Sequence, residues 1–125
     1  DAARFAAQLA RECRRDLVIV YIAEIFYNEY VDESDPDSVA RRDQFSREAA
    51  TDLDRWADAH DLAGRRIALC GSPVEHLLEL AEQERPSLLV LGSRRLSTAL
   101  RLFTNSTAST IAAYSPCPVA VVPPA

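Results

Sequence analysis

The chain has 125 residues, a length typical of one domain, and its hydrophobic content of 48% is enough to build a buried core. A net charge of −5 argues against nucleic acid as the main partner, and the apolar runs are too short to span a membrane. All 14 basic residues are arginine, which excludes a Walker A lysine, a Schiff-base lysine and a Ser-Lys dyad.

Three cysteines and two histidines limit the redox and metal chemistry open to this chain. Cys13, Cys70 and Cys117 form no C-x-x-C pair and lie in apolar stretches. We interpret them as reduced core residues of a cytoplasmic protein. His60 and His76 lack the ligand spacing of a metal site, so we expect no bound metal of this kind.

The first half of the chain reads as helix, strand, loop and helix. Helical spacing of apolar residues predicts a helix over Asp1–Arg15, and the β-branched run Leu17–Ala23 predicts a buried parallel strand. We interpret the acidic segment Glu24–Asp37 as a solvated loop, and the alternative, a metal site, lacks the EF-hand spacing. Ser38–Asp61 has the pattern of a long amphipathic helix. The residues predicted to form its core face are Phe45, Ala49, Leu53, Trp56 and His60.

A glycine and a proline mark the boundaries of the next elements. Gly64 is the predicted left-handed stop after the long helix, and Arg66–Cys70 is the next strand. Ser72 and Glu75 have the spacing of a capping box, with proline at the first helical position. The sequence therefore predicts a helix over Pro73–Arg85.

The last third contains a strand, a glycine, a polar loop, a helix start and a final strand. Leu88–Leu91 is a predicted buried strand that stops at Gly92, and the Ser/Thr-rich segment Asn105–Thr110 begins a helix. Ser115–Pro118 then precedes the final strand Val119–Val122. Free N–H groups at a helix start attract anions, so this layout suits phosphate binding, although every parallel α/β sheet contains it.

Helices and strands alternate along the whole chain. Such alternation requires parallel strands joined by right-handed crossovers. We therefore predict an α/β fold with a doubly wound parallel sheet, in a single domain over residues 1–125.

The spacing of the glycine loop is specific. Gly92, Arg95, Asn105 and Ser106 stand in the frame G-x2-G-x9-G-[ST], and Pro116–Val119 follows without insertion. This stretch resembles the C-terminal half of the universal stress protein family, whose nucleotide-binding members have three glycines in that frame. The resemblance covers nearly the whole chain. It implies a Rossmann-like, adenine nucleotide alpha hydrolase-like three-layer sandwich and a role in the stress response.

The resembled fold begins one element earlier than this sequence. In the family, a first strand carrying an aspartate precedes the opening helix and lies at the centre of the sheet, and nothing after Asp1 corresponds to it. An empty centre would leave two unpaired strand edges inside the sheet. The chain also contains no methionine. We therefore expect the strand to lie upstream or to be supplied by another chain.

The resemblance also implies a set of nucleotide-contacting residues. In the family, the glycine loop and the following helix start wrap the phosphates of ATP with Mg²⁺, and the second strand touches adenine. Carried onto this sequence residue by residue, the set is Ile22, Gly92, Arg94, Arg95, Asn105, Ser106 and Thr107.

Two effects compete at this loop. Glycine allows positive φ and close approach of the backbone to phosphate, and two of the three glycines are replaced. Asn105 is the milder replacement because asparagine tolerates the left-handed region. Arg95 narrows the loop with its Cβ, although its guanidinium could reach a phosphate in bidentate fashion. The lost geometry, at about 1–3 kcal/mol per strained residue, weighs at least as much as one charged hydrogen bond.

Two functions from different classes follow. One is a dimeric regulatory module of the stress response with a degenerate nucleotide loop and no catalysis, since no G-x-S-x-G elbow or recognisable catalytic pair is present. The other is an ATP-binding switch or slow ATPase. We expect a homodimer through Val119–Val122, which is an edge strand in the resembled order, and a possible protein partner, but neither nucleic acid nor membrane.

Overall fold

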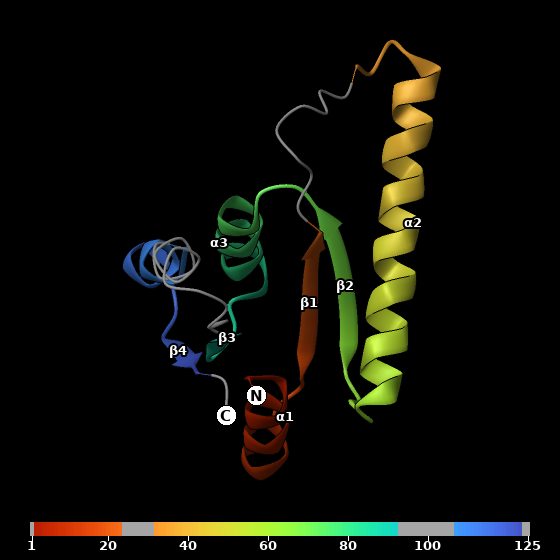
Figure 1. Cartoon of the computed structure of the whole chain (residues 1–125). Coiled ribbons are helices and arrows are strands. Elements are labelled where there is room, and N and C mark those ends of the chain that lie inside the picture. The colour runs from red at the N-terminus through yellow and green to blue at the C-terminus, as the bar shows by residue number, and fades with distance from the viewer. Residues whose placement is uncertain (1, 24–31, 93–106, 124–125) are drawn as a thin grey trace. The chain divides into compact units, whose positions relative to one another are not determined.

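The computed structural model describes residues 2–23, 32–92 and 107–123, in which helices alternate with parallel strands (Figure 1). Internal contacts divide the chain into two compact units. One unit combines Asp1–Arg15 with Pro73–Ala125, and the other is Asp16–Ser72. Each unit contains one parallel pair of strands.

The unit Asp16–Ser72 consists of β1 (Val18–Ala23), α2 (Pro36–Ala59) and β2 (Arg65–Cys70). The two strands pair in parallel, from Val18 opposite Arg65 to Ala23 opposite Cys70. Helix α2 runs alongside this pair (Figure 1). Both predicted strands are confirmed to within a residue.

Helix α2 begins two residues earlier than predicted, and the reason is a cap that the sequence reading overlooked. Asp35 has extended backbone angles, and its carboxylate accepts a hydrogen bond of 3.1 Å from the Asp37 N–H. Pro36 occupies the first turn, where its fixed φ suits a helix and its missing N–H costs nothing. Ser38 is buried inside the helix, and its hydroxyl accepts a hydrogen bond from the Asp32 N–H.

The buried face of α2 is rotated from the predicted one. Ala49, Leu53 and Ala57, at four-residue steps, are at most 4% exposed. Phe45 and Trp56 are 41% and 42% exposed, so the prediction that they belong to the core is wrong. The two small alanines allow the helix axis to lie close to the strands, which leaves the larger aromatic side chains at the margin of the contact.

The predicted role of Gly64 is also wrong. Asp61, with φ of 54°, provides the left-handed residue after α2, and Gly64 does not have such an angle. Gly64 is constrained by space instead. A Cβ at this position would lie 2.7 Å from the backbone oxygen of Leu17, next to the point where the Arg65 N–H donates to that oxygen.

The other unit contains α1 (Ala2–Cys13), α3 (Pro73–Glu84), β3 (Leu89–Gly92) and β4 (Val119–Val122). Residues 107–114 are also helical. Strands β3 and β4 pair in parallel, from Leu89 opposite Val119 to Gly92 opposite Val122. Helix α1 packs against both strands. The apolar side of α1 is centred on Ala7, and among the described residues of this unit the other buried side chains are Ala81 and Ile111.

Two local predictions for this unit require correction. Ser72 and Glu75 make no capping-box hydrogen bonds within the described ranges, so Pro73 alone marks the start of α3. Cys13 is exposed and Cys70 and Cys117 are only partly buried, so the prediction of core cysteines is wrong, although all three are free thiols. Cys13, the last residue of α1, lies about 120° around the helix from the buried Ala7.

The predicted single sheet joins strands of both units, with a strand missing between β1 and β3. The single sheet and the single domain over residues 1–125 both depend on how the two units are placed. Both therefore stay predictions. Among the described helices, none has the length and apolar character needed to cross a membrane.

Candidate functional site

The candidate phosphate loop follows β3. Gly92 is the last residue of this strand, exposed, and paired with Val122 of β4. Its φ is not in the left-handed region, and a Cβ placed on it would make only an ordinary contact of 3.4 Å with the Ala2 Cβ. The described packing therefore does not require glycine at this position.

The structure describes only some of the residues predicted to form the nucleotide site. Arg94, Arg95, Asn105 and Ser106 lie outside the described residues. Thr107 is half-buried at the start of the helical residues 107–114, as the predicted helix requires. Ile111, one turn further on, is 1% exposed and anchors that helix in its unit.

Ile22 belongs to the other unit. It lies near the carboxyl end of β1, half-buried, and opposite Leu69 of β2. This is the end of a parallel strand at which ligands of open α/β sheets bind. The adenine contact of Ile22 stays a prediction.

The segment Ser115–Pro118 has a structural explanation that the motif alone does not provide. The Ser115 hydroxyl donates to the Cys117 carbonyl at 2.9 Å and accepts from the Cys117 N–H at 3.2 Å. The Leu89 N–H donates to the Pro118 carbonyl at 2.9 Å and so joins the start of β3 to the turn. These contacts place the first residue of β4 in register with β3. The sequence analysis did not predict this hydrogen-bonding role of Ser115. The signal for it was the spacing, because a serine two residues before its backbone partner is typical of a local serine turn.

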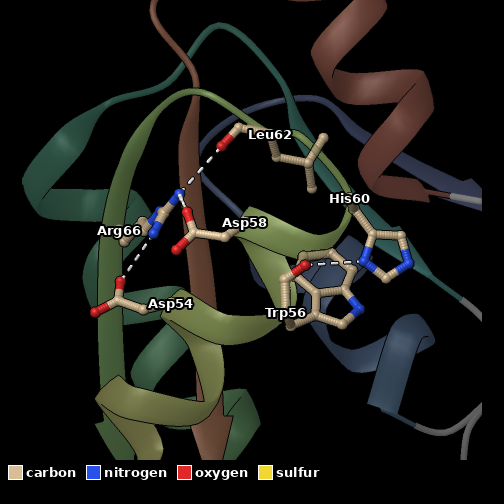
Figure 2. A network of polar contacts seen from close by, with 6 residues as sticks. All are labelled: Asp54, Trp56, Asp58, His60, Leu62 and Arg66. Atoms are coloured by element: carbon tan, nitrogen blue, oxygen red, sulfur yellow. Dashed lines mark hydrogen bonds and ion pairs between the residues drawn. The ribbon is translucent and has the colours of Figure 1, made fainter.

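A polar network in the unit Asp16–Ser72 was also missed (Figure 2). The Arg66 guanidinium on β2 donates to Asp54 at 3.0 Å and to Asp58 at 2.8 Å on α2, and to the Leu62 carbonyl at 3.3 Å. Hydrogen bonds to Asp58 and then Asp54 raise the pKa of the guanidinium above its ordinary value. The i, i+4 spacing of the two aspartates was a visible signal for one shared partner. The network joins the end of α2 to β2.

Next to this network, the end of α2 carries a histidine with a structural role (Figure 2). His60 is the C-terminal cap, its ring Nδ1 lies 2.8 Å from the Trp56 carbonyl oxygen, and its ring lies 4.8 Å from the Trp56 ring. The prediction of His60 as an end-of-helix residue is confirmed, whereas its assignment to the core face is wrong because the side chain is exposed.

The described part of the acidic loop, from Asp32 onward, organises the start of α2. Asp32 accepts from the Ser34 hydroxyl at 2.6 Å and from its N–H at 2.9 Å, which lowers the pKa of the Asp32 carboxyl. Glu33 forms an ion pair with Arg42, and Asp35 is the helix cap. In the described part of the chain, no three His, Cys, Asp or Glu side chains are grouped as metal ligands.

Comparison with known proteins places this arrangement in a family. The model of the universal stress protein family matches residues 1–123. The universal stress protein in the QAH/OAS sulfhydrylase 3' region of Thermus aquaticus is 38% identical over 56 residues. That match spans 45% of this chain and 41% of the relative, so the alignment covers less than half the length of the curated relative.

Two solved structures are similar over almost the whole chain. A universal stress protein crystallised in complex with cAMP has a TM-score of 0.60 and 26% identity, covering 99% of this chain and 86% of its own. A universal stress protein family member from Burkholderia pseudomallei has a TM-score of 0.60 and 23% identity, covering 98% of this chain and 85% of its own. Both confirm the predicted Rossmann-like α/β fold. The chain belongs to the universal stress protein family, a family of the stress response.

Proposed function

We propose that this chain is a dimeric regulatory module of the stress response whose nucleotide loop is degenerate and which catalyses no reaction. The observation that carries the proposal is the loop itself. Gly92 and Ser106 keep the family frame, while Arg95 and Asn105 stand where nucleotide-binding members have glycine. A side chain at each of those positions obstructs close approach of the backbone to a triphosphate.

Nucleotide binding is the second candidate, and a specific observation favours it. Gly92 is not required by the described packing, whereas Gly64 is, so Gly92 remains free for a loop or ligand function. A similar solved structure holds cAMP, a nucleotide with a single cyclic phosphate. Such a ligand needs fewer backbone contacts than ATP with Mg²⁺. A loop that keeps one of its three glycines is better matched to one phosphate than to three, and the guanidinium of Arg94 or Arg95 can supply hydrogen bonds to that phosphate.

Nucleotide content and calorimetry separate these candidates. The purified protein is denatured and its supernatant is assayed for nucleotide, and the refolded or nucleotide-free protein is titrated with ATP plus magnesium and separately with cAMP. The regulatory proposal expects neither co-purified nucleotide nor heat at millimolar ligand. Heat with ATP would overturn it in favour of the ATP-gated switch, and heat with cAMP alone would identify a site for a single phosphate.

Variants of the loop test the physical reason for the proposal. Arg95→Gly should restore measurable ATP binding if the lost glycine is what prevents it. If the unmodified protein binds ATP, Ser106→Ala and Arg95→Glu should each weaken binding, the latter more strongly at low salt because it reverses a charge. Arg47→Glu, an exposed charge reversal on α2, is the matched control and should leave binding unchanged.

A further inference from the structure

Charge is distributed unevenly between two helices of the unit that combines Asp1–Arg15 with Pro73–Ala125. From α1 to Arg15 there are four arginines and one glutamate, in a chain whose net charge is −5. Helix α3 contains four glutamates and no arginine, and one arginine, Arg85, follows it. A segregation of sign on this scale favours an interaction between oppositely charged surfaces.

The arginines of α1 form a stripe on one helical face. Arg4, Gln8 and Arg11 follow one another at steps of four and three residues, and all three are exposed. Neither Arg4 nor Arg11 makes an ion pair with any described residue. Gln8 donates one amide hydrogen to Glu12 at 3.0 Å and keeps a second. We name these three residues the arginine stripe.

Helix α3 carries a stripe of the opposite sign with the same spacing. Glu75, Glu79 and Glu82 also follow at steps of four and three residues and are exposed, on the side away from the buried Ala81. Within the described ranges none of the three has an ion pair or a side-chain hydrogen bond. We name them the glutamate stripe.

The charges of α2 are arranged differently. Arg42 pairs with Glu33, Arg55 with Asp52, and the neighbouring strand supplies Arg66 for two aspartates of the helix. Arginine and acidic residues alternate along its length. Arg41 and Arg47 make no ion pair with described residues, but both signs are mixed along α2, which therefore presents no stripe of one sign.

We propose that the arginine stripe of one copy of this chain binds the glutamate stripe of a second copy. Both stripes repeat at steps of four and three residues, so successive members of each stripe lie about 6 Å and 4.5 Å apart along its helix axis. Two parallel helices can therefore align every member of one stripe with a member of the other. The aligned pairs are Arg4 with Glu75, Gln8 with Glu79, and Arg11 with Glu82. The guanidinium fork suits carboxylates.

The strength of this contact follows from its exposure. Exposed ion pairs are individually weak and are screened by salt, so association is expected at low ionic strength and high protein concentration. The contact joins unlike surfaces and is therefore heterologous, distinct from a two-fold pairing of one surface with itself. A polyphosphate partner is disfavoured because the chain as a whole is acidic.

Charge reversal with exchange between variants tests the proposal. Sedimentation velocity of the full chain is compared at ionic strengths of about 0.01 M and 0.5 M, between which the Debye length falls from about 30 Å to under 5 Å. Beyond any dimer that persists at high salt, the unmodified protein should associate further with rising concentration only at low salt. Arg4→Glu/Arg11→Glu and Glu75→Arg/Glu82→Arg should each lower the association constant by about tenfold or more. An equimolar mixture of the two double variants should restore it.

The matched control is Arg41→Glu/Arg47→Glu, which makes the same charge change on exposed positions of α2 and should leave association unchanged. Circular dichroism checks folding, and Arg4→Gln/Arg11→Gln serves if the reversals unfold the protein. The absence of salt-sensitive association, an equal effect of the control, or no restoration in the mixture would overturn the proposal. So would loss of association in the α1 variant alone, which would assign the arginine stripe to a different acidic surface.

Discussion

The packing of the described residues requires glycine at Gly64 but not at Gly92. At Gly64 a side chain would meet the carbonyl oxygen of Leu17 at 2.7 Å, and that oxygen also accepts the hydrogen bond from Arg65 that aligns β1 with β2. At Gly92 a Cβ would find ordinary van der Waals contact with Ala2. A Cβ therefore has no space at Gly64 in one unit, whereas the described residues leave space for a Cβ at Gly92 in the other.

Gly64→Ala should accordingly destabilise the protein by about 1–3 kcal/mol in the free energy of unfolding, because the new Cβ forces the backbone of residues 17 and 64 apart. Urea denaturation followed by circular dichroism measures the change. Gly92→Ala is the control and should shift the free energy of unfolding by less than about 0.5 kcal/mol. Equal losses in the two variants would contradict the packing explanation.

Single residues were also where the sequence reading was least accurate. Apolar spacing located Leu53 in the core but assigned Trp56, three residues on, to the same face, whereas Ala57, four residues on, is the buried one. That choice depends on how closely α2 approaches the strands, which is a tertiary property. The cap at Asp35 was overlooked because four acidic residues stand together there, and only the fold distinguishes the one that accepts from the Asp37 N–H.

At the scale of elements, periodicity and composition were reliable. The two strand pairs and the three long helices lie where apolar runs, prolines and glycines predicted them, with shifts of one or two residues at their ends. The candidate loop is different. Its glycine frame identified the family, but Arg94, Arg95, Asn105 and Ser106 lie outside the described residues, so their contacts stay predictions.

Helix α2 is attached by two kinds of contact. Its alanines and Leu53 pack on the strands, and the Arg66 network fixes its last turns (Figure 2).

Ala57 is 0% exposed, so Ala57→Leu should overpack the contact and cost about 1–3 kcal/mol of unfolding free energy. Ala50→Leu, an exposed site of the same helix with the same change in residue type, should cost less than about 0.5 kcal/mol. Thermal or urea unfolding of both variants gives the comparison, and equal costs would refute the close approach of α2.

At the scale of the whole molecule, the proposed homodimer rests on β4. This strand pairs with β3 on one side, and no other described strand of its own unit pairs with its second edge. A short apolar edge invites pairing with another chain. Pro118 and Pro123 flank it and limit the length over which a second strand can add. These features favour one closed two-fold contact over continued addition.

Val121→Glu tests the homodimer because Val121 is 45% exposed, so a charge there should interfere with the contact more than with the core. We expect the unmodified protein to sediment as a dimer at micromolar concentration and the variant as a folded monomer, with circular dichroism as the check on folding. Working at an ionic strength of about 0.5 M suppresses the proposed contact between the stripes of α1 and α3, since the Debye length is then only a few ångströms.

Tyr114→Glu is the control for this test. It adds the same charge at an apolar position that is 74% exposed, outside β4, and should remain dimeric. A monomeric unmodified protein under these conditions would end the proposal, and a dimer that persists in Val121→Glu would move the interface away from β4.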